Sequence, residues 1–176
     1  YRFGQETGTL PGIAPRVLPG TRATSFMQDL AVGGSYSTES KITIYLEYDY
    51  HEAGFTRDDW RNWFLIGQAY RNVAAIPGQL WYIRSYALDQ QEPLAREAGV
   101  LRVTWNDAFV PNLEFCGFVN TNLHDDSSVI QISASYPLSS QWTIGALGLV
   151  NSGTDRSEHG SITLENSLLL KAIRYF

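Results

Sequence analysis

The sequence predicts an all-β protein whose strands form an antiparallel transmembrane β-barrel, or the C-terminal portion of such a barrel. Apolar and polar residues alternate through seven segments of the chain, which is the pattern of a strand with one apolar face. Aromatic residues make up 13% of the chain and charged residues only 18%, which favours pleated, half-buried surfaces. No apolar run approaches the roughly 20 residues that a membrane helix requires, so a helical membrane protein is excluded.

The first part of the chain is predicted to lack regular structure, and the remainder is predicted to form strands. Residues 1–22 are rich in Pro and Gly and predict an irregular loop. Residues 23–176 carry the strands, except for 51–97, which we expect to be a long extracellular excursion. The period of two places strands at 26–36, 41–50, 99–105, 113–120, 130–136, 142–150 and 162–176.

The segment 41–50 shows the alternation most clearly. Ile42, Ile44 and Leu46 share one face, while Thr43 and Glu47 lie on the opposite one. Soluble β-sandwiches alternate in the same way, so this pattern alone does not separate a lipid-facing barrel from a water-soluble β domain.

Three further features favour the barrel. Short connections at 37–40, 107–111 and 137–140 alternate with longer, more polar ones at 121–127 and 151–161, which is the rhythm of periplasmic turns and extracellular loops. The chain ends on an aromatic residue that closes a strand. Aromatic residues also stand at strand ends beside short turns, where a girdle at a membrane interface would place them. The predicted girdle residues are Tyr36, Tyr136, Trp142 and Phe176.

The excursion at 51–97 contains a predicted amphipathic helix within TRDDWRNWFLIGQAYRNV, residues 56–73. Thr56 is a suitable N-cap, and acidic residues follow in the first turn. Three roles are open for this helix: packing on the barrel wall over its mouth, a gating plug, or contact with a partner or lipopolysaccharide. A further strand at 80–88 is also compatible with the pattern. The apolar residues at helical spacing are Trp60, Trp63, Phe64 and Ile66.

If the apolar faces contact lipid, the opposite faces line a lumen. Those faces carry charges of both signs, which form either a salt-bridge network that fills the lumen or the walls of a water-filled pore. Four of them, on three strands that are close in the predicted order, form the expected contact site: Glu47, Asp49, Arg102 and Glu114. The predicted lumen-lining residues are Lys41, Glu47, Asp49, Arg102, Glu114 and Lys171, and the charged residues Asp29 and Glu165 are expected on the same faces.

The sequence predicts no enzyme, no metal site and no cofactor. The single cysteine, Cys116, excludes an internal disulfide and a cysteine-ligated metal site. A net charge of -5 without a basic cluster excludes the electrostatic footprint of a nucleic-acid-binding protein. The groups that a hydrolase or a metal would use fall on separate predicted loops or side by side on one loop, which gives no convergent arrangement. They are His51, His124, His159, Asp125, Asp126, Ser157 and Ser161.

The segment SLLLKAIRYF, residues 167–176, resembles the C-terminal strand of Gram-negative outer-membrane barrels, which commonly end in Phe with apolar residues at alternate positions. Leu168, Leu170, Ala172 and Phe176 fit that pattern, whereas Arg174 departs from it. Residues 103–150 also resemble the final hairpins of porin-like and uncharacterised outer-membrane proteins.

This resemblance implies a location in the bacterial outer membrane and contact with its lipid and lipopolysaccharide. It also implies recognition by the barrel-assembly machinery through the C-terminal strand, and other membrane subunits are compatible with it. The implied function is a porin-like channel or uptake protein for small solutes. A structural or partner-anchoring barrel with a filled lumen is the alternative, followed by an outer-membrane hydrolase.

Seven strands do not close a bacterial single-chain barrel, which takes an even number of at least about eight. Residues 1–22 contain a further strand, or the excursion adds two strands while the N-terminal segment adds another, or the chain is the C-terminal portion of a larger barrel. We adopt the last interpretation as the expectation.

Overall fold

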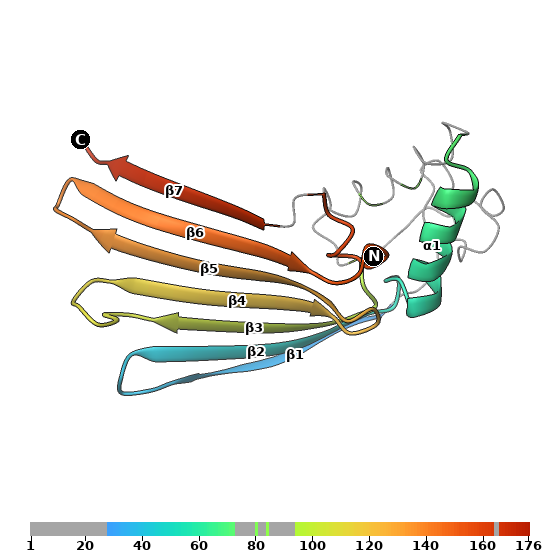
Figure 1. Ribbon diagram of the computed structural model, residues 1–176. Coiled ribbons are helices and arrows are strands. Elements are labelled where there is room, and N and C mark those ends of the chain that lie inside the picture. The colour runs from blue at the N-terminus through green and yellow to red at the C-terminus, as the bar shows by residue number, and fades with distance from the viewer. Residues whose placement is uncertain (1–27, 73–79, 81–83, 85–93, 164–165) are drawn as a thin grey trace. The chain divides into compact units, whose positions relative to one another are not determined.

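The computed structural model describes residues 28–72, 80, 84, 94–163 and 166–176 (Figure 1). The irregular loop predicted at 1–22 lies outside these residues. The chain separates into two compact units, one made of 1–30 with 50–97 and the other of 31–49 with 98–176. Antiparallel strands dominate the described residues, which confirms the all-β prediction.

Seven strands form a single sheet in which each strand lies beside its neighbours in sequence, in the order β1-β2-β3-β4-β5-β6-β7. In the described residues of the chain this sheet is open, with β1 and β7 as its edges, so it is not closed into a barrel. The strands are β1 (Asp29–Ser37), β2 (Ile42–His51), β3 (Glu97–Trp105), β4 (Glu114–Asn122), β5 (Ser127–Pro137), β6 (Trp142–Ser152) and β7 (Asn166–Arg174).

The register sorts the side chains into an apolar face and a polar face. The partners Leu101, Val119, Ile130 and Val150 form one row across four strands, and because side chains alternate along a strand, all of them lie on the same face. The opposite face carries rows such as Thr104, Cys116 and Ser133. We call these the apolar face and the polar face.

The apolar face is the more exposed of the two. In β2 the residues Ile44, Leu46 and Tyr48 are exposed, while Tyr45 and Glu47 on the polar face are half-buried. A water-soluble sheet with one buried face has the opposite arrangement. In the unit that holds the sheet, the exposed large residues of the apolar face are Val32, Tyr36, Ile44, Leu46, Tyr48, Leu101, Ile132, Trp142, Ile144, Val150, Leu168 and Leu170.

Two of the connections between strands differ in length from the prediction. The connection predicted to be long at 121–127 contains only four residues, 123–126, because the two strands continue to Asn122 and from Ser127. The one predicted to be tight at 107–111 runs through 106–113. The connections 38–41, 106–113 and 138–141 lie at the same end of the strands, which we call the turn end. We call the opposite end of the strands the loop end. Figure 1 shows the three turn-end connections together with the C-terminus.

The eight residues 106–113 include three with positive φ: Asp107 at 55°, Phe109 at 61° and Asn112 at 66°. Asp and Asn tolerate this conformation, but a bulky side chain rarely adopts it. Aromatic contacts hold Phe109 there, since its ring centroid lies 4.7 Å from that of Trp105 and 6.1 Å from that of Phe115. The backbone strain is therefore offset by packing at the turn end.

Helix α1 (Arg57–Ala69) belongs to the other unit and confirms the predicted helix. Thr56 and Asp59 form a capping box: Asp59 N donates to Thr56 Oγ1 at 3.2 Å, and Thr56 N donates to Asp59 Oδ2 at 2.9 Å. No described helix is long and apolar enough to cross a membrane.

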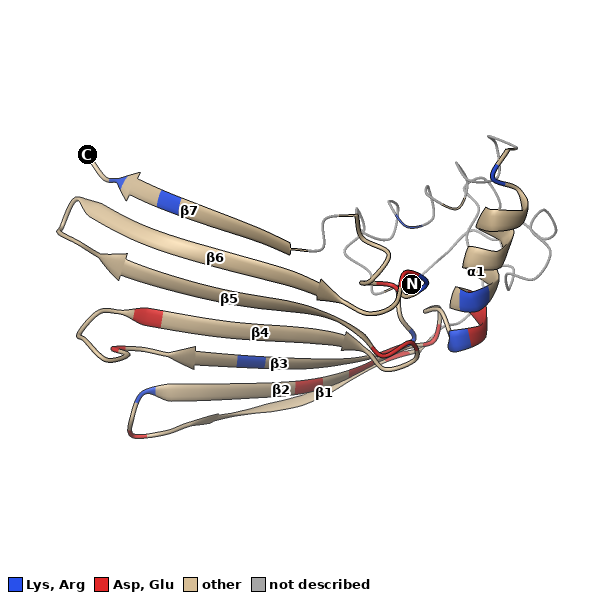
Figure 2. Cartoon of the chain, viewed as in Figure 1, with Lys and Arg blue, Asp and Glu red and all other residues tan. Residues whose placement is uncertain are grey.

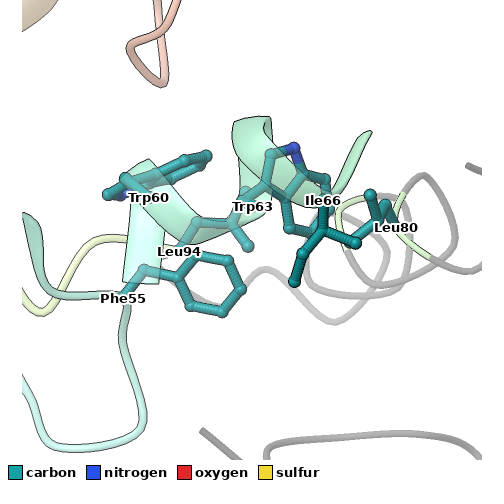
Figure 3. Close-up of a cluster of buried hydrophobic side chains, with 6 residues drawn as sticks. All are labelled: Phe55, Trp60, Trp63, Ile66, Leu80 and Leu94. Carbon is teal, nitrogen blue, oxygen red and sulfur yellow. The ribbon is translucent and has the colours of Figure 1, made fainter. Parts of the chain in front are cut away.

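The apolar stripe of α1 packs within its own unit. The stripe buries Trp60, Trp63 and Ile66, and the buried cluster is completed by Phe55, Leu80 and Leu94 (Figure 3). Within this cluster the ring of Phe55 contacts those of Trp60 and Trp63, with centroids 5.2 and 5.6 Å away. Leu80 and Arg84 are helical, which corrects the strand considered at 80–88 at those two positions; the rest of that segment lies outside the described residues.

At the turn end, Lys41 joins two turns through an ion pair with Asp107. The Lys41 ammonium and the backbone N–H of Asn112 donate hydrogen bonds to the Asp107 carboxylate, and these lower its pKa. A carboxyl group whose pKa is lower in the folded than in the unfolded state stabilises the fold above its unfolded pKa, near 3.9. That contribution is lost as the pH falls through the folded pKa.

We therefore expect Asp107→Asn to remove some of the acid sensitivity of unfolding. The wild-type chain loses stability as the pH falls below about 4, and the variant loses less over the same interval, because the variant has no carboxylate to protonate. Thermal unfolding followed by circular dichroism from pH 6 to pH 2 measures this difference. Equal slopes in the two proteins would contradict the assignment.

Candidate functional site

The polar face carries the candidate site, because side chains from five neighbouring strands line one cavity of about 710 Å³ there. A flat sheet would leave these residues on an open surface, so their convergence indicates that the sheet curves over its polar face. Most of the lining residues have polar side chains, and the full set is Ser35, Thr43, Tyr45, Val100, Arg102, Thr104, Glu114, Cys116, Phe118, Gln131 and Ser133.

Two of the four charged residues predicted as a contact site, Arg102 on β3 and Glu114 on β4, line this cavity. Neither has a hydrogen-bond or ion-pair partner among the described residues. Both side chains are exposed. A guanidinium and a carboxylate that face the same space without pairing are available to hydrated ions or polar solutes.

The other two predicted contact residues, Glu47 and Asp49, lie on the polar side of β2. Glu47 accepts a hydrogen bond from the hydroxyl of Tyr45, which itself lines the cavity. Glu47 therefore positions Tyr45 in the cavity. Asp49 lies two residues beyond Glu47 in β2, closer to the loop end.

The last two predicted lumen residues lie apart from the cavity. Lys41 is not in a strand but in the turn before β2, with φ of 60°. Lys171 lies on β7, the edge strand, where its side chain crosses Gly145 of β6: a Cβ placed on Gly145 would approach Lys171 Cε to 2.9 Å. It lines a second, largely apolar cavity of about 530 Å³. Figure 2 shows how few charges the strands carry, with none in β5 or β6.

The predicted girdle residues gather at the turn end. Tyr36 closes β1, Tyr136 and Trp142 flank the turn 138–141, and Phe176 follows β7. Tyr36, Trp142 and Phe176 are exposed and Tyr136 is half-buried. Trp105, Phe109 and Phe115 extend the same group of aromatic side chains, which sequence analysis did not include.

A buried polar network links the two connections at the loop end. Asp125 Oδ1 accepts hydrogen bonds from Ser127 N at 2.9 Å and Ser127 Oγ at 2.6 Å, and Asp125 Oδ2 accepts one from Glu158 N at 2.6 Å. Asn122 Nδ2 donates to Glu158 Oε2 at 2.8 Å. Ser127 and Asn122 are fully buried, so these hydrogen bonds are shielded from water. The network fixes one loop to the other.

Several groups considered for catalysis belong to this network, in structural roles. Ser157 Oγ donates to the carbonyl of Thr154, and His159 contributes its backbone N–H to Ser127 Oγ at 3.2 Å. His51 lies in the other unit, where it pairs with Asp29. No group of His, Cys, Asp and Glu in the described residues of the chain has the arrangement of a metal site.

No protein-family model matches the chain, and no curated protein or solved structure matches it significantly.

Most residues that line the cavity are uncharged, whereas the contact site predicted from the sequence contained charged residues alone. The alternation along each strand does place five of the uncharged lining residues on the polar face: Thr43, Tyr45, Thr104, Gln131 and Ser133. Which of them meet across strands depends on register, and that is not encoded in the alternation of any single strand.

Proposed function

We propose that the chain forms wall strands of a transmembrane β-barrel in a bacterial outer membrane and that its polar face lines a solute pathway. The apolar face contacts lipid and the turn end lies at one membrane interface. The protein acts as a porin-like channel or uptake protein for small solutes. This proposal extends the open sheet described above by further strands.

The observation that carries the proposal is the exposure of the apolar face. Exposed large apolar side chains lie on the apolar face of six of the seven strands, whereas residues of the polar face of β2 are half-buried. Contiguous exposed apolar surface of this extent marks an interaction with lipid or protein. Alternation of apolar-out with polar-in, flanked by an aromatic girdle, is the arrangement of a barrel in lipid.

The direct test begins with extraction. The 176-residue chain should dissolve only with detergent, show β-type circular dichroism, and migrate differently in a denaturing gel before and after heating. Planar-bilayer recordings then measure conductance. A chain that stays monomeric and folded in plain buffer would refute the membrane location.

Charge substitutions in the cavity should change the ion selectivity of the pore. Arg102→Gln is expected to shift permeability toward cations and Glu114→Gln toward anions, because each removes one fixed charge from the pathway. At a distance of about 6 Å in water one charge contributes roughly 0.7 kcal/mol, which corresponds to roughly a threefold change in the permeability ratio at low salt. Reversal potentials in a salt gradient measure the ratio. Shifts of the same sign in both variants would contradict a lumenal position.

A barrel with a filled lumen is the second candidate, and one feature favours it. Toward the β7 edge the polar face becomes apolar, since Leu147 and Leu149 of β6 and Leu169 and Ile173 of β7 lie on it. Such residues suit packing against a plug. A heat-modifiable protein without conductance would favour this candidate over the channel.

A further inference from the structure

Within the described residues 31–49, 98–163 and 166–176, Arg174 is the single charged side chain on the apolar face; Glu97, the first residue of β3, belongs to the other unit. The position of Arg174 follows from the register: it pairs with Trp142, whose neighbours on the same face are Ile144, Ala146 and Val150. It lies near the end of β7, at the turn end, beside the aromatic side chains described above. A charge on a lipid-facing surface is costly near the middle of the bilayer and tolerated near its interfaces. The location of Arg174 therefore fits an interface.

Two aromatic rings hold the guanidinium of Arg174. Its Cζ lies 5.7 Å from the ring centroid of Trp142 and 4.9 Å from that of Phe176. Both distances are within the range of cation–π attraction. The two rings orient the side chain, but they accept none of its hydrogen bonds in the ordinary sense.

The N–H donors of this guanidinium have no hydrogen-bond or ion-pair partner among the described residues. A guanidinium has five such donors in a fixed, planar fork that matches the oxygens of a phosphate. Trp and Tyr side chains prefer the depth at which lipid headgroups lie. An oriented, unpaired guanidinium at this depth has a phosphodiester as its complementary group.

We propose that Arg174, held by Trp142 and Phe176, binds the headgroup phosphate of a membrane phospholipid in the leaflet at the turn end, with preference for anionic lipid. This proposal rests on the proposed membrane location of the apolar face. The chain carries a net charge of -5, so a preference for anionic lipid would have to come from a local contact. It also accounts for an arginine in a strand that places Leu168, Leu170 and Ala172 on the same face.

The test measures which lipid lies next to Trp142. The chain is reconstituted in phosphatidylcholine vesicles that contain the same mole fraction of either brominated phosphatidylglycerol or brominated phosphatidylcholine, and the quenching of Trp fluorescence is compared. The signal of Trp142 is isolated by subtracting that of Trp142→Phe. Arg174→Gln removes the proposed contact, and Arg71→Gln, which removes the same charge outside the sheet, is the matched control.

We expect the local enrichment of phosphatidylglycerol to be about fivefold in the wild-type and Arg71→Gln proteins and close to one in Arg174→Gln. Insertion with equal quenching by both lipids in all three proteins would overturn the lipid contact while leaving the proposed function intact. Failure of the wild-type chain to insert into either vesicle would overturn both.

Discussion

Replacing Ile132 with Arg is expected to prevent insertion into lipid, whereas replacing its neighbour Gln131 with Arg is not. Ile132 lies in the middle of β5, is 60% exposed and projects from the apolar face; Gln131 projects from the polar face and lines the cavity. An arginine at the bilayer midplane of a barrel costs about 2–4 kcal/mol, and the cost on the lumenal side is small. The two variants have the same charge and nearly the same position in the chain.

The fraction of chain that acquires heat-modifiable migration in vesicles measures this effect. If the sheet were instead exposed to water, Ile132→Arg would be neutral or would increase solubility, because the side chain already lies outside any core. Equal insertion of both variants would therefore refute lipid contact at the apolar face. Failure of both would show that β5 does not tolerate the volume of arginine on either face, and Ile132→Gln would then report polarity without that volume.

The second large effect is expected at the loop end, where Asp125→Ala should release the two loops from each other. The substitution removes the acceptor of three hydrogen bonds and leaves Ser127 N, Ser127 Oγ and Glu158 N without it. Unsatisfied buried donors cost about 1–3 kcal/mol each, so a loss of about 3 kcal/mol is expected after partial relaxation. Asp155→Ala is the matched control, because Asp155 is exposed and lies in the connection that follows β6, the other of the two loops.

Limited proteolysis of the chain folded in detergent measures the opening of these loops. A local free-energy loss of about 3 kcal/mol corresponds to roughly a 100-fold increase in the open population and hence in cleavage within 123–126 or 153–163. Cleavage rates that match those of Asp155→Ala would show that the network does not hold the loops.

The strands were predictable because each one repeats its own signal. Ile44, Leu46 and Tyr48 alternate with Tyr45 and Glu47 in a way that no helix would reproduce, and the capping box at Thr56 similarly marked the start of α1. Both signals are local, so they can be recognised in the sequence without knowing the rest of the fold.

The loop end was not predictable from such local signals. Asn122 and Ser127 were predicted to lie in a polar connection, yet they are buried strand residues. Asn122 bonds to Glu158 and Ser127 bonds to His159, both more than thirty residues later in the chain. The last strand likewise begins at Asn166 rather than at the predicted Ile162, whose backbone N–H is bonded to His159 O. Contacts between distant segments decided these boundaries.

The strand order of the sheet also determines which further strands could close it. Neighbouring strands run in opposite directions: the turn 38–41 reverses β1 into β2, Asn106 N reaches Lys41 O at the start of β2, and β3 to β7 pair antiparallel. With seven strands, β1 and β7 therefore point the same way. Joining them directly would create a parallel pair, and so would seating identical copies of these seven strands side by side in one orientation. A closed wall that has antiparallel pairs alone therefore requires an odd number of strands beyond the seven in the described residues. Under that condition, neither direct closure of these seven strands nor a ring of identical copies of them is possible.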